Sequence, residues 1–228
     1  MTSPFSIKRP WELHWKCLPS NLRKMNYVNG ESPKECAALD AIAKVGIIGG
    51  RQLSRLFRLP KKRLKRMERE QKIVRHELRV NKQTIPVYTL GQVGAVITEV
   101  PYESNYWVEY RTKDVLKRLM FFELYPYFPE SAILSAPGPF TGAIEFQGKL
   151  FHIYVSRGDI KDLIMHLKWK GIGQERLIIV AESLNHLQPL KIYAKEMKLR
   201  ITTDEDLQAG EGKLFYLLNQ DGEFVKEG

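Results

Sequence analysis

Apolar residues recur at helical spacing in the first half of the chain. Ser32 begins a helix-start pattern, with Pro33 at the first helical position and Glu35 placed to complete a capping box. Gly46 is expected to end this helix. Between these signals runs one apolar stripe, formed by Ala38, Ala41, Ile42 and Val45.

Two more helices and a hairpin are predicted directly afterwards. A short helix follows Gly49-Gly50 with Leu53, Leu56 and Phe57 inward, and a third helix, Lys61–Gln71, turns Leu64 and Met67 inward. The period then becomes two, so Ile73–Val80 and Thr84–Leu90 read as a hairpin around the polar tip Asn81-Lys82-Gln83. A short closing helix is expected from Gln92 to Glu99. This order is that of a winged helix-turn-helix, placed at residues 32–100.

The second half, residues 101–228, alternates helices and strands. Helices are expected at Lys113–Tyr125, Ile160–Lys170 and Leu187–Met197. Strands are expected at Ser131–Ala136, Gly142–Phe146, Lys149–Val155, Leu177–Val180, Leu199–Thr202 and Leu214–Leu217, with a polar tail after them. The order predicts an α/β domain with a mixed sheet, so the fold class of the whole chain is α/β (α+β).

Residues 1–31 read as an N-terminal arm. The arm carries Pro4, Pro10 and Pro19 together with Trp11 and Trp15. Free tails rarely carry side chains this large and apolar, so we expect the tryptophans to pack, either on their own chain or on a partner.

Composition indicates an ordinary cytoplasmic protein. The 228 residues are 43% hydrophobic and 27% charged, which suffices for a folded core. The longest apolar runs are far shorter than a membrane span, and the first residues lack the apolar region of a secretory signal. Cys17 and Cys36 fit neither a disulfide framework nor zinc-ligand spacing.

The positive charge is concentrated in one block. Lys and Arg number 36 against 26 Asp and Glu, a net charge of +10. Between Arg51 and Lys82 there are 13 basic and 3 acidic residues, while the rest of the chain has 23 of each. Such a block is typical of a polyanion-binding module, although a solvated basic face without a partner is the alternative.

The charge block coincides with the elements that would touch duplex DNA. On the third helix we expect Lys61, Lys62 and Arg66 nearest the base edges and Lys65 and Arg69 nearer the phosphates. At the start of the second helix, Gly49–Gln52 is expected to bind a phosphate through free N–H groups. The full set of expected DNA-binding residues is Arg51, Gln52, Lys61, Lys62, Arg63, Lys65, Arg66, Arg69, Arg79, Asn81 and Lys82.

Several segments resemble a known family. PKKRLKRMEREQKIVRHELRV followed by VYTLGQVGA is similar to the recognition helix, wing and closing helix of the replication-relaxation family of bacterial plasmids and mobile elements. FHIYVSRGD and FTGAIEF resemble strands of that family's second domain. The resemblance covers roughly Ser32–Thr202. It implies a winged helix joined to a restriction-endonuclease-like α/β domain.

The acids that a metal-dependent nuclease needs are out of place. Such a site requires a carboxylate on one strand and acid-x-Lys on the next, but the corresponding positions read Thr141-Gly142 and Ile153-Tyr154-Val155-Ser156. Glu145 and Asp159-Ile160-Lys161 are the nearest substitutes, and Asp159 is explained as a helix cap. Two further acid-x-Lys matches lack a partner acid, Glu196-Met197-Lys198 and Glu211-Gly212-Lys213. We therefore expect no enzyme activity.

No cofactor or metal is indicated elsewhere. The five histidines are scattered, and His152 and His166 are expected to be ordinary half-buried residues. Phosphate-binding glycine motifs are absent from the sequence, so no nucleotide cofactor is expected.

The sequence thus predicts a cytoplasmic, non-enzymatic protein that binds double-stranded DNA as a regulator or accessory factor of a plasmid or mobile element, in transcription or replication control. A homodimer is expected because the second half is rich in aromatic side chains: Trp107, Tyr110, Phe121, Phe122, Tyr125, Tyr127 and Phe128. The alternative is that all of them are internal. Two other functions stay open, a metal-dependent endonuclease and a protein-interaction scaffold of a replication or conjugation complex.

Overall fold

The computed structural model describes residues 3, 5–19, 30–170, 176–194, 197–210, 213–219 and 222–227. The chain forms two units, Arg9–Leu119 (the helical unit) and Met1–Lys8 with Met120–Gly228 (the mixed-sheet unit). This division differs from the boundary expected near Val100, because residues 101–119 belong with the helical unit. The class expected from the sequence, mixed α/β with a mixed sheet, is confirmed.

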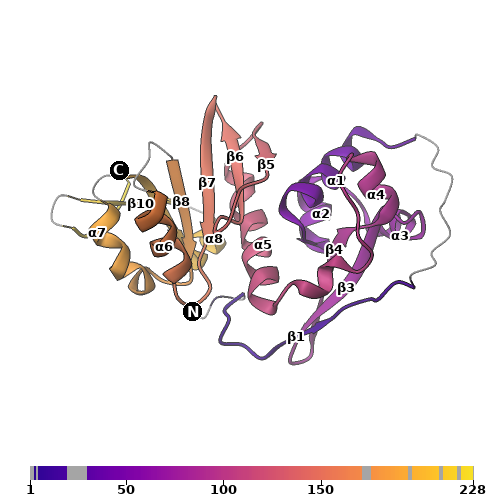
Figure 1. Cartoon of the computed structure of the whole chain (residues 1–228), viewed down its shortest axis with the longest axis horizontal. Coiled ribbons are helices and arrows are strands. Elements are labelled where there is room, and N and C mark those ends of the chain that lie inside the picture. Colours follow the sequence, from indigo (N-terminus) through magenta and orange to yellow (C-terminus); the bar gives the residue numbers. More distant parts are fainter. Residues whose placement is uncertain are drawn as a thin grey trace. The chain divides into compact units, whose positions relative to one another are not determined.

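The helical unit contains the helices expected in the first half (Figure 1). They are α1 (Pro33–Val45), α2 (Gly50–Leu56), α3 (Lys61–Arg69) and α4 (Gln92–Ile97), followed by the 3-10 turn η1 (Tyr106–Glu109). The capping box of α1 is present, since the Glu35 carboxylate accepts the Ser32 backbone N–H at 3.0 Å. Gly46 ends α1 with a φ of +100°, which glycine adopts without strain.

A four-stranded antiparallel sheet completes this unit. Its order is β1 (Trp11–His14), β3 (Ile73–Val80), β4 (Gln83–Leu90) and β2 (Ile48–Gly49). The expected hairpin is confirmed, with Val80 opposite Gln83 and Asn81 at a φ of +52° in the tip.

Two glycines let α4 approach the backbone before β3 closely. A Cβ at Gly91 would lie 2.2 Å from the Gln71 carbonyl oxygen, and one at Gly94 would lie 2.1 Å from that of Lys72. The Gly91 N–H in turn donates to the Lys72 carbonyl at 2.9 Å. This packing therefore requires glycine at positions 91 and 94.

The N-terminal arm is part of the helical unit's sheet. Trp11 starts β1 opposite Val80, and Trp15 meets the His76 ring edge-on at 4.9 Å. Of the two alternatives left open by the sequence, packing on the chain itself is the one observed. The strand is only four residues long, so the alternation of its apolar and polar residues is too short to predict a strand from the sequence.

His76 holds the arm in place from the centre of the sheet. Its side chain is buried, its Nδ1 accepts the Lys16 backbone N–H at 3.0 Å, and its Nε2 lies 2.9 Å from the Thr89 hydroxyl. Acceptance at Nδ1 assigns the neutral ring with its proton on Nε2. Burial, together with the charge of Lys16, lowers the pKa of His76 to about 3.

The mixed-sheet unit is built on seven strands. In spatial order they are β11 (Phe224–Lys226), β10 (Tyr216–Leu218), β9 (Lys198–Thr203), β8 (Arg176–Ala181), β7 (Lys149–Val155), β6 (Gly142–Phe146) and β5 (Ala132–Leu134). β7, β8 and β9 are parallel, and the remaining pairs are antiparallel.

Helices cover both faces of this sheet. α6 (Lys161–Lys170) and the 3-10 segment η3 (Leu184–Leu190) share one apolar cluster with Tyr154, Leu177 and Ile179. α5 (Thr112–Leu124) crosses the unit boundary, and its Phe121 packs on the other face against Gly142, where a Cβ would lie 2.9 Å from the ring. The short 3-10 turn η2 (Tyr125–Tyr127) follows α5.

Three features of the C-terminal part differ from expectation. The helix expected at Leu187–Met197 is divided into η3 and α7 (Lys191–Ala194), with Pro189 inside η3. An additional helix, α8 (Asp204–Ala209), follows β9 and is capped by the Thr203 hydroxyl. The expected polar tail contains the edge strand β11, whose three residues are too few to show a period.

The aromatic side chains behind the homodimer expectation are occupied within the chain. Trp107, Phe121, Phe122 and Phe128 are buried. The Tyr125 and Tyr127 hydroxyls donate to the carbonyls of Ser131 and Leu207, and the Tyr110 ring lies under the Arg118 guanidinium at 4.4 Å. Their number therefore gives no support to an interface between copies.

His76 predicts a pH-dependent stability. Its pKa in the folded chain lies below that of the unfolded chain, so its contribution is complete above about pH 6.5 and is lost as the pH falls toward 3. Between pH 7 and pH 5 we expect urea unfolding to show a loss of roughly 2 kcal/mol that the His76→Gln variant lacks. Equal pH dependence in the two proteins would contradict this role, and His14→Gln, at an exposed position, is the matched control.

Candidate nucleic-acid interface

α3 is a two-sided helix. It begins after Pro60, and Leu64 and Met67 are its buried positions. The turn that leads into it contains Arg58 at a φ of +54° and the buried Leu59. Because Leu64 and Met67 fix the inner side, the positions on the outer side face solvent.

Four cations on the outer side of α3 have no partner. Lys61, Lys62, Lys65 and Arg69 are exposed, and none makes a hydrogen bond or ion pair with another described residue. Three other exposed basic residues of the charge block share this property in the described structure: Arg51 on α2, Arg58 in the turn and Lys82 in the hairpin tip. Within the charge block as the structure describes it, these seven cations remain available to an anion.

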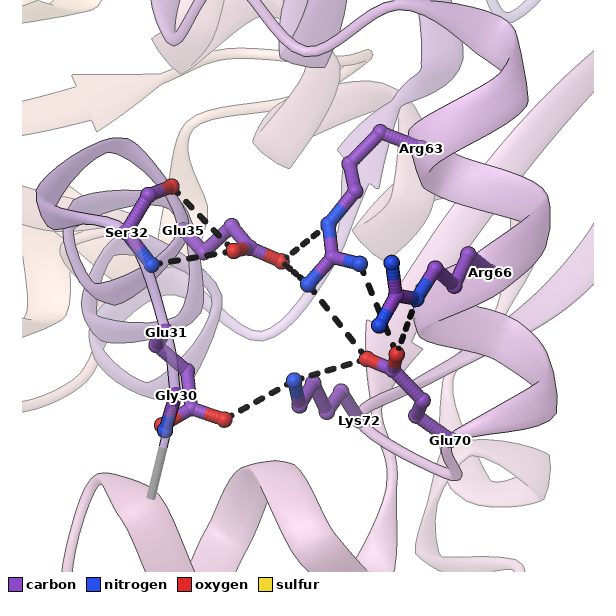
Figure 2. A network of polar contacts seen from close by, with 8 residues as sticks. All are labelled: Gly30, Glu31, Ser32, Glu35, Arg63, Arg66, Glu70 and Lys72. Carbon is purple, nitrogen blue, oxygen red and sulfur yellow. Dashed lines mark hydrogen bonds and ion pairs between the residues drawn. The ribbon is translucent and has the colours of Figure 1, made fainter. Parts of the chain in front are cut away.

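Arg63 lies on the inner side of α3, where carboxylates hold it (Figure 2). Its Nε donates to Glu35 on α1 at 2.6 Å, and a terminal nitrogen makes a second, shorter contact with the same oxygen. The other side of the guanidinium reaches Glu70 at 3.4 Å. Only 21% of the Arg63 side chain is exposed, so this residue positions α3 on α1 and is not a free DNA contact. The expectation for Arg63 is corrected accordingly.

Glu70 connects this ion pair to the start of β3. Its carboxylate accepts from Arg66 at 2.7 Å and from Lys72 at 2.7 Å, and Lys72 also meets Glu31 at 2.8 Å (Figure 2). Burial alone would raise the pKa of Glu70, but the hydrogen bonds from Lys72 and Arg66 outweigh it and the pKa is lowered. Burial alone would likewise lower the pKa of Lys72, and its bonds to Glu31 and Glu70 raise it instead.

Arg66 is exposed like the unpaired cations of α3, but it is bonded to a carboxylate like Arg63. Its side chain is 70% exposed although it is bonded to Glu70 four residues later. A surface pair of this kind contributes little stability, so Arg66 can exchange Glu70 for a phosphate at small cost.

The hairpin tip is polar and exposed, as a wing requires. Asn81 and Lys82 are exposed in the turn. Arg79 is 47% exposed but bonded to Glu77 at 2.7 Å, and Arg75 reaches the same carboxylate at 3.0 Å. Hydrogen bonding from Arg79 keeps the pKa of Glu77 low. Two of the three basic residues of the hairpin, Arg75 and Arg79, therefore share one local carboxylate.

The expected phosphate contact at Gly49–Gln52 is wrong in part. Gly49, Gly50 and Gln52 are buried. The Gln52 side chain accepts the Gly49 N–H at 2.9 Å and donates to the Leu119 carbonyl at 2.7 Å, so it satisfies the backbone inside the fold. Of the two DNA contacts expected at this helix start, only Arg51 is exposed.

The nuclease candidates do not converge. Glu145 lies opposite Leu150 in the β6–β7 pair, whereas Asp159 follows the far end of β7. Five residues of strand separate these levels, which corresponds to about 17 Å and exceeds any shared metal site. The Asp159 carboxylate accepts the Lys161 N–H at 3.3 Å, as expected of a cap. Glu196 and the pair Glu211-Gly212 lie outside the described residues.

The described part of the chain contains no group of three or more His, Cys, Asp or Glu side chains that would hold a metal ion. His152 and His166 are half-buried, as expected, and each ring contacts that of Phe140. A cavity of about 680 Å³ opens where β8 and β9 begin, and the one carboxylate among its described lining residues, Glu227, is paired with Arg200 at 2.6 Å.

Comparison of the chain with protein-family models, curated proteins and solved structures found no match. The resemblance to the replication-relaxation family therefore stays an expectation that its sequence motifs alone support. Among the described residues, no helix has the length and apolar character needed to cross a membrane.

Sequence reasoning missed the carboxylates that hold α3. Glu31 and Glu35 precede Arg51, the start of the charge block, by 20 and 16 residues, so counting charges within the block leaves them out. The capping-box pattern did single out Glu35, but for its bond to Ser32. Its second oxygen, which binds Arg63, has no signal in the sequence.

Loss of the Glu35–Arg63 pair should lower stability more than loss of an exposed ion pair on the same helix. Glu35→Gln leaves the largely buried Arg63 with one distant carboxylate, and we expect the free energy of unfolding to fall by about 1–3 kcal/mol. Asp40→Asn, on the same helix, removes an exposed pair with Lys44 and should cost less than about 0.5 kcal/mol. Urea unfolding compares the two variants, and similar losses would refute the positioning role of Glu35.

Proposed function

We propose that the chain is a double-stranded-DNA-binding protein whose helical unit is a winged helix-turn-helix. The element order supports this: α1, α2 and α3 are followed by the β3–β4 hairpin, and a sharp turn at Arg58 joins α2 to α3. In this arrangement α3 is the recognition helix and the hairpin tip is the wing.

The observation that carries the proposal is the separation of charges on α3. Carboxylates hold its inner arginine, while Lys61, Lys62, Lys65 and Arg69 face solvent without a counter-charge in the described structure. Keeping four like charges on a nine-residue helix costs free energy through repulsion, which the negative charge of a bound polyanion relieves. When the polyanion is DNA, release of its condensed counterions adds to the free energy of binding.

The seven available cations define the expected contacts. Lys61 and Lys62, in the first turn of α3, are placed to reach base edges, since the first residues of a recognition helix contact bases. Lys65 and Arg69 continue along the same side toward the phosphates. In the wing, Asn81 and Lys82 are placed to reach the adjacent backbone or the minor groove.

The biological role that fits this activity is a regulator or accessory factor in the transcription or replication control of a plasmid or mobile element, as the resemblance implies. The separation of Glu145 and Asp159 argues against endonuclease chemistry at these two acids of the mixed-sheet unit. In this proposal that unit contributes contacts with partners or with a second copy.

Reversing exposed charges on α3 should abolish binding. The double variant Lys62→Glu, Lys65→Glu is expected to lower the affinity for a 30-base-pair duplex at least 100-fold, because it removes one cation facing the bases and one facing the phosphates and adds two repulsive charges. The control, Lys161→Glu with Lys168→Glu on α6, changes the net charge equally at exposed sites and should bind normally. Unchanged affinity in a folded α3 variant would exclude this recognition helix.

Measuring duplex binding at several salt concentrations, with and without Mg²⁺, distinguishes DNA binding from the endonuclease and scaffold alternatives. For wild-type protein, log K should fall with a slope of about −5 to −7 against log salt if ~5–8 phosphates are neutralised. A flat dependence would contradict the proposal. Cleavage of the duplex on adding Mg²⁺ would favour the endonuclease, and no binding at all would favour a protein-interaction scaffold.

We extend the proposal to a homodimer on DNA. A single module of this kind buries a small interface, and helix-turn-helix proteins commonly gain affinity by binding two half-sites as a dimer. Light scattering of the full chain at tens of micromolar should then give twice the mass of 26.5 kDa. A mass near 26.5 kDa at every concentration, with and without duplex, would exclude the dimer.

A further inference from the structure

Three charged side chains stand in one row just beyond the carboxyl ends of the parallel strands. Val155 is level with Val180 and Thr202 in the pairing of β7, β8 and β9. Two residues further along each strand come Arg157, Glu182 and Asp204. The carboxyl ends of parallel strands are where open α/β sheets bind their ligands.

The row is assembled by the fold itself. Arg157 and Asp204 are buried, and the guanidinium meets the carboxylate at 3.1 Å. Burial raises the pKa of Asp204, and the nearby Arg157 opposes this effect. The Nε of Arg157 is buried without a hydrogen-bond partner in the described structure, so the row has unused bonding capacity.

The N-terminal residues of the same unit cover this row. The Ser6 hydroxyl donates to Glu182 at 2.9 Å, and the Ile7 backbone N–H donates to the other oxygen of that carboxylate at 2.9 Å. The Ser3 hydroxyl donates to Asp204. Two serine hydroxyls and one backbone N–H of the segment thus donate hydrogen bonds to the row.

Polar groups make the hydrogen bonds that attach the segment to the row, and Phe5 is half-buried beside them. Ser6 is the buried residue of the described part of the segment, whereas Ile7 is 37% exposed and Lys8 is exposed. Ordering five residues costs conformational entropy of about the same size as three hydrogen bonds to charged groups contribute. The entropy cost of ordering the segment therefore offsets much of what these hydrogen bonds contribute, which favours displacement of the segment by a competing ligand.

We propose that these strand ends form a binding site for an extended, serine-containing peptide, and that Ser3 and Phe5–Lys8 of the chain occupy it as a displaceable internal ligand. The chemistry of recognition is donation of seryl hydroxyl and backbone N–H groups to Glu182 and Asp204. Displacement by a similar peptide would free the segment that leads, within three residues, into β1. This inference does not depend on DNA binding.

Hydrogen exchange on the full-length chain tests the internal contact. The Ile7 amide should be protected in the wild type and should exchange at least tenfold faster in Ser6→Asp, which places a carboxylate against Glu182. Ser6→Ala, which only deletes a hydrogen bond, should show a smaller increase. Ser135→Asp makes the same substitution at an exposed site and should leave Ile7 unchanged. An unprotected Ile7 amide in the wild type would overturn the proposal.

Binding in trans tests the site. A fluorescent peptide of residues 1–9 should bind full-length Ser6→Asp at least tenfold more tightly than wild type, where the internal segment competes at high effective concentration. Adding Glu182→Ala should abolish this binding, while Glu205→Ala, at an exposed neighbour of Asp204, should not. The same peptide with Asp in place of its second serine is the non-binding control.

Two results of the binding experiment would reject the site. One is a folded Ser6→Asp protein that does not bind the peptide. The other is loss of the folded state, seen by circular dichroism, in both Ser6→Asp and Ser6→Ala, because the segment would then be a permanent part of the core.

Discussion

The surface of the helical unit depends on the carboxylates beneath α3. Glu35 and Glu70 neutralise Arg63 on the inner side, and Lys72 joins Glu70 to Glu31 (Figure 2). Unpaired, the buried part of these cations would oppose packing of the helix on α1 and β3. With them paired, Leu64 and Met67 enter the core and the remaining charge of α3 is directed to solvent.

The two units use polar groups in different ways. In the helical unit, buried polar groups such as His76 and Gln52 complete the hydrogen bonding of nearby backbone, which fixes the N-terminal arm and the start of α2. In the mixed-sheet unit, the parallel order of β7, β8 and β9 brings Arg157, Glu182 and Asp204 together from distant parts of the sequence. The first arrangement stabilises local structure, and the second forms the row that we propose as a peptide site.

Much of the secondary structure was predictable from periodicity. The capping box, the apolar stripe of α1 and the alternation in β3 and β4 each give a local signal, and all three elements were found as expected. The short edge strands β1 and β11 were not predictable, since each exists through pairing with a partner strand and has too few residues to show a period. The unit boundary within α5 left no signal in the sequence either.

For the candidate interface, the sequence by itself determined the size of the basic block and the two sides of α3. The positions of Leu64 and Met67 are enough to turn Lys61, Lys62, Lys65 and Arg69 outward. Only the tertiary structure decided which charges remain available. Glu35 comes from another helix to bind Arg63, and Gln52 turns inward to cap its own helix. Charge is a property of composition, but neutralisation requires contact, and contact between residues far apart in the chain is set by the fold.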